Sequence, residues 1–179
     1  MPHKHSKLLL TTLTRYTAAA AFTLAGCASD RVIATSDDSA GSLGVSTSQS
    51  VARPWKGRCD VDASFTSPPT LSIAGTCQLA HLGRTTVSAI QTIEPGPTGI
   101  VYTNTATYTS ANGDQLITTN AGIATPNASG LSLLGIETAA GGTGRFGNSS
   151  GTATLTGAVA FTSPTTTTGS YFLDGTLNY

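Results

Sequence analysis

Apolar and polar residues alternate along most of the chain after its first third. In one such run Ala153, Leu155, Val159 and Phe161 share a face, and threonines occupy most of the other face. This period of two is typical of β-strands with one buried side. Short segments rich in Gly, Pro, Asn and Asp separate eight runs of this kind. The expected strands span about 57–66, 71–79, 84–93, 99–109, 115–124, 130–138, 152–162 and 169–179.

The connections between the expected strands are short, which predicts an antiparallel meander. Asn112-Gly113 is the strongest hairpin signal in the chain and predicts a type I′ turn. An open meander would leave two unpaired edges, and closing it into a barrel removes both. We therefore expect an all-β fold, an eight-stranded antiparallel up-and-down barrel. Barrels of this size are filled by side chains or hold one small ligand.

The N-terminal part of the chain lacks the alternation. Basic residues (Lys4, Lys7) precede a short apolar run that ends near Leu24, which is typical of a secretory signal and too short to span a bilayer. Ser, Asp, Ala and Gly then dominate up to about Pro54, as in a flexible tether. The expected organisation is a signal peptide at 1–26, a tether at 27–54 and a barrel domain at 55–179.

The signal-like run ends in Leu24-Ala25-Gly26-Cys27, which resembles the bacterial lipobox. The resemblance implies cleavage before Cys27 and acylation of Cys27, so that the protein is attached to a membrane by an N-terminal lipid anchor. An ordinary cleaved signal with a chance cysteine is the alternative. Ala28, rather than Asp, follows the cysteine, and by the usual sorting pattern this implies the outer membrane in a host with two membranes. The expected location is the cell envelope.

The cysteine count supports an exported protein. The chain has three cysteines, and setting Cys27 aside leaves Cys59 and Cys77. An even pair in an oxidising compartment predicts one disulfide, here between the first two expected strands. The sequence contains no Cys/His cluster with metal-ligand spacing, so neither a metal nor a cofactor is expected.

The charge pattern argues against a nucleic-acid-binding protein, and the glycine pattern does not support a dinucleotide-binding one. The leader holds three of the nine basic residues, which leaves six against nine acidic ones, and this weak, scattered charge gives no footprint for nucleic acid. Gly142, Gly144 and Gly147 match the G-x-G-x-x-G dinucleotide fingerprint. That fingerprint requires a following helix, whereas a Thr-rich β pattern follows here, so the segment is interpreted as a tight β connection.

Four segments of the barrel region resemble a known group of proteins: 81–84 (HLGR), 111–116 (ANGDQL), 141–146 (GGTGRF) and 173–179 (LDGTLNY). They look like small exported bacterial proteins that are related in architecture to the allene oxide cyclase and dirigent barrels. The resemblance covers about residues 55–179 and implies a calycin-like barrel. It transfers no catalytic residue, because no motif here matches those of the plant cyclase.

The turns of a meander alternate between its two ends, and the two ends of the expected barrel differ. Prolines cluster at one end, and five polar or charged residues lie at or near the other: His81, Arg84, Asp114, Glu137 and Arg145. Barrel mouths are preferred ligand sites, so we expect the mouth at this second end. Strand parity places His81 and Glu137 inward. The alternative is that these are turn charges and structural ion pairs, such as Arg145 holding the Gly-rich connection.

Three functional hypotheses follow from the sequence. The first is a lipid-anchored envelope module that is structural or binds a small apolar ligand, with no catalytic residue assigned. The second is an isomerase or cyclase that acts on a small apolar substrate in the bore. The third, an outer-membrane barrel, is disfavoured because Thr/Ala/Gly strands lack an apolar band with aromatic girdles.

Overall fold

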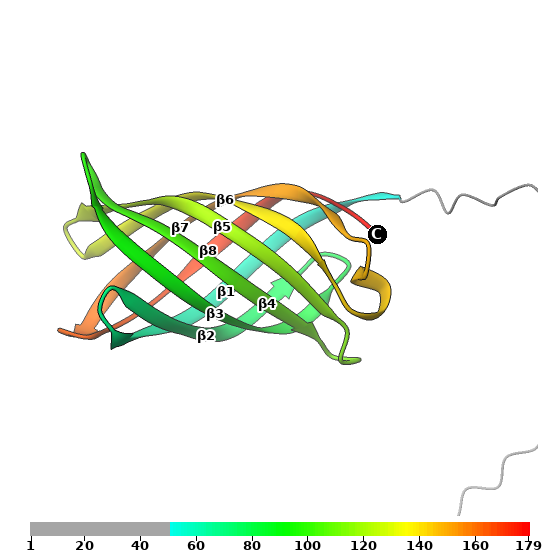
Figure 1. Cartoon of the computed structure of the whole chain (residues 1–179), viewed down its shortest axis with the longest axis horizontal. Coiled ribbons are helices and arrows are strands. Elements are labelled where there is room, and N and C mark those ends of the chain that lie inside the picture. The colour runs from blue at the N-terminus through cyan, green and yellow to red at the C-terminus, as the bar shows by residue number, and fades with distance from the viewer. Residues whose placement is uncertain (1–50) are drawn as a thin grey trace, which may run out of the picture. The chain divides into compact units, whose positions relative to one another are not determined.

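The computed structural model describes residues 51–179, which form a closed barrel of eight strands in sequence order (Figure 1). All neighbouring strands are antiparallel, and a single 3₁₀ turn interrupts the meander. The expected fold class is therefore confirmed. The elements are β1 (Ala52–Ser67), β2 (Thr70–Leu79), β3 (Gly83–Gly96), β4 (Gly99–Ser110), β5 (Gln115–Asn127), β6 (Gly130–Gly142), η1 (Gly144–Phe146), β7 (Ser150–Ser163) and β8 (Thr166–Asn178).

Pairing of the first strand with the last closes the barrel. The register joins Ala52 to Asn178 and Ser64 to Thr166, so both strands are paired over almost their full length. This pairing also explains why β1 begins about five residues before the expected strand. Its first residues have no clear alternation of their own, but their backbone groups find partners at the end of β8.

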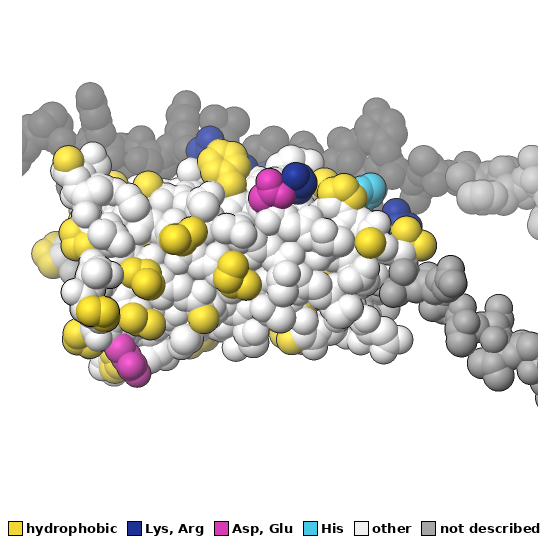
Figure 2. Space-filling view, turned by 90° about the horizontal axis from the view of Figure 1, so that it is seen from above, with side chains coloured by type: hydrophobic (Ala, Val, Ile, Leu, Met, Phe, Trp, Pro, Cys, Tyr) yellow, Lys and Arg dark blue, Asp and Glu magenta, His cyan; other side chains and the backbone are white. Residues whose placement is uncertain are grey.

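Alternating side chains divide the barrel into an apolar interior and a mainly polar exterior. On β7, for example, Ala153 and Leu155 are buried, whereas Thr152, Thr154 and Thr156 are exposed. Most outward positions are polar, and Figure 2 shows apolar side chains among the others on one face. Three of the exposed apolar residues (Val101, Ile123 and Leu134) are directly paired positions on β4, β5 and β6, so they are neighbours on the outside of the barrel. A membrane-spanning barrel has the reverse distribution, with an apolar band outside and a polar interior.

The two ends of the barrel are built differently. We call the end formed by the turns at 68–69, 97–98, 128–129 and 164–165 the proline end, because most of the barrel's prolines lie in or beside these turns. We call the other end the capped end; it is formed by 80–82, 111–114 and 143–149. In Figure 1 the C-terminus and η1 lie together at the capped end.

The connection between β4 and β5 differs from the expected type I′ turn. That turn needs positive φ at both central residues, but here only Gly113 has it, at 89°. Gly113 N donates to Ser110 O over 2.9 Å, and Asp114 N donates to the side-chain Oδ1 of Asn112 over 3.2 Å. The side chain of Asn112 thus stabilises a turn that places only the glycine in the left-handed region.

The predicted disulfide is present. Cys59 on β1 and Cys77 on β2 are directly paired across the two strands, with their Cα atoms 4.0 Å apart. Both residues are buried and belong to the apolar core. The disulfide therefore links two neighbouring strands from inside the barrel.

Candidate ligand-binding site

A cavity of about 120 Å³ occupies the part of the barrel next to the proline end. Its walls are mostly aliphatic, with Val61 and Leu71 among the buried lining residues. The lining residues nearest the turns are half-buried or exposed, so the cavity reaches solvent at this end. They include Phe65, Ile93, Ile100, Leu131, Val159 and Phe161.

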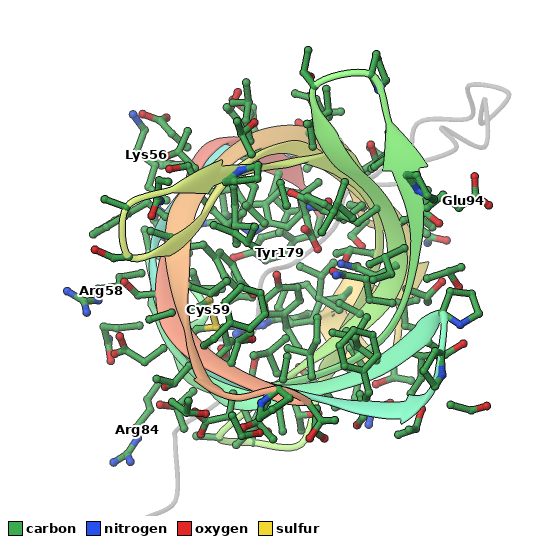
Figure 3. The ribbon with its side chains drawn as sticks, turned by 90° about the vertical axis from the view of Figure 1, so that its left-hand side faces the viewer. Lys56, Arg58, Cys59, Arg84, Glu94 and Tyr179 are labelled. Carbon is green, nitrogen blue, oxygen red and sulfur yellow. A yellow bond between two sulfur atoms is a disulfide. The ribbon has the colours of Figure 1, made fainter. Side chains whose placement is uncertain are left out.

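The capped end is sealed by large side chains. Trp55, Leu116 and Phe146 are 0% exposed. Phe146 is carried inward by η1, and its ring meets the ring of Tyr179 edge to face with 5.0 Å between centroids. Figure 3 looks into the barrel from the proline end and shows Tyr179 lying across the far end of the bore. The expectation that the bore opens at this end is therefore wrong, because the Gly-rich connection supplies a plug rather than a mouth.

The structure separates Glu137 from the four other residues of the expected mouth. His81 is exposed in the turn before β3 with a φ of 63°, and Arg84 points away from the barrel (Figure 3). Arg145 lies 4.7 Å from the centre of the Phe146 ring, and its Nε is 3.8 Å from Asp114 Oδ2. Arg145 thus contacts Asp114 and the Phe146 ring at the capped end, and neither Arg145 nor Asp114 lines the cavity.

Glu137 does point into the bore, whereas the inward orientation expected for His81 is wrong. Extending the alternation of β3 backwards predicted that the His81 side chain points inward. However, β3 begins only at Gly83, so His81 belongs to the preceding turn and strand alternation does not determine its direction. Glu137 lies well inside β6, where parity determines the face.

Glu137 is the centre of a buried hydrogen-bond network. The carboxyl is 1% exposed and lines the cavity. Its Oε1 accepts from the hydroxyl of Thr118 and, over 3.2 Å, from the hydroxyl of Tyr108. Its Oε2 accepts from Asn120 Nδ2 over 2.5 Å. The hydroxyls of Tyr108 and Tyr171 are 3.0 Å apart, so Tyr171 can donate to Tyr108 while Tyr108 donates to Glu137.

Four polar side chains form a row across the inner wall. Gln91, Asn104, Asn120 and Glu137 are directly paired positions on β3, β4, β5 and β6. Asn104 Nδ2 donates to Gln91 Oε1 over 3.3 Å, and Asn120 donates to Glu137 as described. An apolar barrel therefore contains one polar band, which we call the polar row.

The hydroxyl of Tyr102 lies beside the polar row in a notch made by two glycines. Tyr102, Gly122 and Gly135 are directly paired positions on β4, β5 and β6. A Cβ atom at Gly122 or Gly135 would lie 2.5 or 2.6 Å from the Tyr102 hydroxyl oxygen. The absence of side chains at both glycines therefore makes room for the hydroxyl, which has no hydrogen-bond partner in the described part of the chain.

Burial controls the protonation of these groups. Desolvation raises the pKa of Glu137, even though the hydrogen bonds from Thr118, Asn120 and Tyr108 act in the opposite direction. Burial, and then the neighbouring Glu137 carboxylate, raises the pKa of Tyr102 to about 12. The pKa values of Tyr108 and Tyr171 are raised as well, chiefly by burial. The three phenols therefore remain protonated at neutral pH and act as hydrogen-bond donors.

Most of this site escaped the sequence-based prediction, which identified only Glu137. The missed residues are polar or tyrosine side chains at inward parity: Gln91, Tyr102, Asn104, Tyr108, Thr118, Asn120 and Tyr171. The available signal was that Gln91, Asn104, Asn120 and Glu137 interrupt the apolar face of four successive strands. Detecting this signal requires the strand register, because only the register shows that the four residues are neighbours.

Two expectations concern other parts of the chain. Cys27, the proposed lipid attachment point, lies outside the described residues. Within residues 51–179 no group of His, Cys, Asp and Glu side chains is arranged to hold a metal ion.

Comparison with family models, curated proteins and solved structures finds no match to this chain. Among the described residues there is no helix of the length and apolar character that a membrane span requires.

Proposed function

We propose that this protein is a lipid-anchored cell-envelope protein whose barrel binds a small, mainly apolar ligand. The observation that carries the proposal is a one-ended apolar cavity with a buried polar row in its wall. Ligand sites commonly combine apolar walls with a few well-placed polar groups. A barrel with a purely structural role would gain stability from filling this space.

The cavity restricts the size of the ligand. Its volume of about 120 Å³ is close to that of engineered cavities of about 150 Å³ that take up benzene. Pockets for drug-sized molecules are larger, about 300–1,000 Å³. The enclosed part of the ligand is therefore about the size of one six-membered ring, and any longer part must extend through the proline end.

A set of six-membered-ring probes tests the binding proposal. Cyclohexane, cyclohexanone and cyclohexanol are titrated into the purified full chain and followed by ligand-observed NMR. We expect saturable binding of at least one probe. Ala89→Phe, which fills the cavity, should abolish binding, and Ser88→Phe on the neighbouring outward-facing position should not.

A second pair of variants covers the case in which Ala89→Phe does not fold. Ala63 lines the cavity nearer the proline end, and Ser64 beside it is exposed. Ala63→Phe should block binding and Ser64→Phe should preserve it. If no probe binds to the wild-type protein, the ligand proposal fails and the barrel is a structural module.

The lipid anchor is tested separately. Leu-Ala-Gly-Cys at 24–27 supports attachment through Cys27. Wild-type protein should partition into the detergent phase, and Cys27→Ala should remain in the aqueous phase. Equal partitioning of the wild-type protein and Cys27→Ala would contradict the proposed lipid anchor. It would not affect the proposal that the barrel binds a ligand.

One observation favours an isomerase or cyclase as the second candidate function. Glu137 is a cavity-lining carboxyl whose pKa is raised by burial, which suits a general base. Such a base would take a proton from carbon next to the carbonyl of cyclohexanone, and solvent would return a deuteron in D₂O. NMR should show exchange that accelerates with pH as Glu137 ionises and is lost in Glu137→Gln. Exchange at the same rate in Glu137→Gln would exclude this candidate.

A further inference from the structure

Three buried polar atoms in or beside the cavity have no hydrogen-bond partner within residues 51–179. They are the hydroxyl oxygen of Tyr102, Oδ1 of Asn104 and Oδ1 of Asn120. Tyr102 and Asn120 are each 3% exposed. A buried polar group without a partner is costly, so a ligand that supplies the missing hydrogen bonds gains affinity.

Two of these atoms approach the same point. A Cβ atom at Gly135 would lie 2.6 Å from the Tyr102 hydroxyl oxygen and 3.0 Å from Asn120 Oδ1. Asn104 is directly paired with Asn120 and lies two residues from Tyr102 on β4, with its side chain on the same inner face. A phenol that can donate and an amide oxygen that can only accept therefore come close together beside Gly135, and a second amide oxygen, from Asn104, belongs to the same inner face.

The charges around the cavity exclude an anionic ligand. None of the described residues that line it is Lys, Arg or His. Glu137 contributes a carboxyl, and the amide groups of Asn104 and Asn120 leave their oxygens unpaired. A ligand carboxylate would be buried without a cation and beside these oxygens, which is strongly unfavourable.

We propose that the polar part of the ligand is a single neutral hydroxyl group, held between Tyr102 and the side-chain oxygens of Asn104 and Asn120. The inference rests on the proposed ligand-binding function. The ligand hydroxyl accepts a hydrogen bond from Tyr102 and donates its own proton to an asparagine oxygen. A ketone satisfies only the first of these bonds, and a hydrocarbon satisfies neither.

Four probes with the same ring test the proposal by calorimetry and ligand-observed NMR on the full chain at neutral pH. They are cyclohexanol, cyclohexanone, cyclohexane and cyclohexanecarboxylate. We expect cyclohexanol to bind about tenfold more tightly than cyclohexanone, since the ketone leaves a buried acceptor unpaired. Cyclohexanecarboxylate should show no binding.

The variant Tyr102→Phe removes only the hydroxyl and keeps the ring that packs against Gly122 and Gly135. It should weaken cyclohexanol binding about tenfold while cyclohexane binding is unchanged. Tyr179→Phe makes the same chemical change at the capped end and should leave every affinity unchanged.

The possible results separate this inference from the function on which it rests. If cyclohexanol, cyclohexanone and cyclohexane bind equally, or Tyr102→Phe has no effect on cyclohexanol, the cavity binds ligands but water satisfies the polar atoms, and the hydroxyl proposal is overturned. The same holds if cyclohexanecarboxylate binds best. If none of the four probes binds, both the ligand-binding function and this inference fail.

Discussion

At the scale of single residues, Glu137 is the ionisable carboxyl in the apolar interior, where its charged form is unfavourable. Glu137 is almost fully buried and accepts hydrogen bonds from three donors, yet burial still raises its pKa. The native state therefore holds its proton more tightly than the unfolded chain. Between the two pKa values, a rise in pH reduces stability, because only the native state then has a proton to lose.

The first prediction follows from the direction of this pH dependence. Wild-type protein should lose stability as the pH rises above the ordinary value for Glu, by at most about 1.4 kcal/mol per pH unit from this group. Glu137→Gln should remove that loss. Urea denaturation at about pH 5 and about pH 8 measures the difference between the two proteins. Glu94→Gln, at an exposed position, serves as the control. Parallel curves for wild type and Glu137→Gln would contradict the prediction.

The second prediction concerns the notch for Tyr102. In Gly135→Ala the new methyl group would lie 2.6 Å from the Tyr102 hydroxyl oxygen. We expect the free energy of unfolding to fall by about 1 to 3 kcal/mol, the usual cost of overpacking. Adding Tyr102→Phe should recover part of this loss because the clashing oxygen is gone. A double-mutant cycle measures the recovery, and simple additivity would show that the hydroxyl does not cause the clash.

At the scale of the strands, alternation predicted the element type and order well and the ends less well. A buried face forces a period of two on every strand, so all eight were recognisable. The segment 139–151 was expected to be one long connection, but β6 continues to Gly142 and β7 begins at Ser150. Glycine-rich strand ends carry no alternation, and only their pairing with neighbours identifies them.

The third prediction concerns the linked strands β1 and β2. The disulfide closes a segment of 18 residues in the unfolded chain. Replacing Cys59 and Cys77 together by Ala should lower the free energy of unfolding by about 3 kcal/mol, mainly because the unfolded chain is no longer constrained. Denaturation with and without dithiothreitol provides the comparison. The reductant should destabilise wild type and leave the double variant unchanged, and an effect on both would point to another cause.

At the scale of the whole molecule, the two ends have opposite roles, and the sequence predicted the asymmetry but inverted its meaning. Proline turns suggested a closed base, and charges with glycines suggested a mouth. The inversion has a physical cause in side-chain volume. Trp55, Phe146 and Tyr179 come from β1, from η1 and from the residue after β8, and their side chains pack together only in the folded barrel. Local sequence patterns therefore cannot reveal that they fill this end of the bore.

The fourth prediction tests this division of roles. Phe146→Ala removes the central ring of the cap and should cost about 3 to 5 kcal/mol of stability. Binding of the ring-shaped probes should be unchanged, since the cavity lies toward the other end. Thermal unfolding and probe titration are measured on the same samples, with the exposed neighbour Asn148→Ala as the control. Altered probe affinity in Phe146→Ala would mean that the two ends are not independent.

The point at which the chain enters the barrel determines which end of the barrel is free for the proposed ligand. β1 begins at the capped end, and the opening of the cavity is at the opposite end. In the proposed lipid-anchored protein, the segment that leads to Cys27 therefore joins the barrel at the capped end, away from the opening. The proposed ligand would therefore enter at the end of the barrel that does not carry this connection.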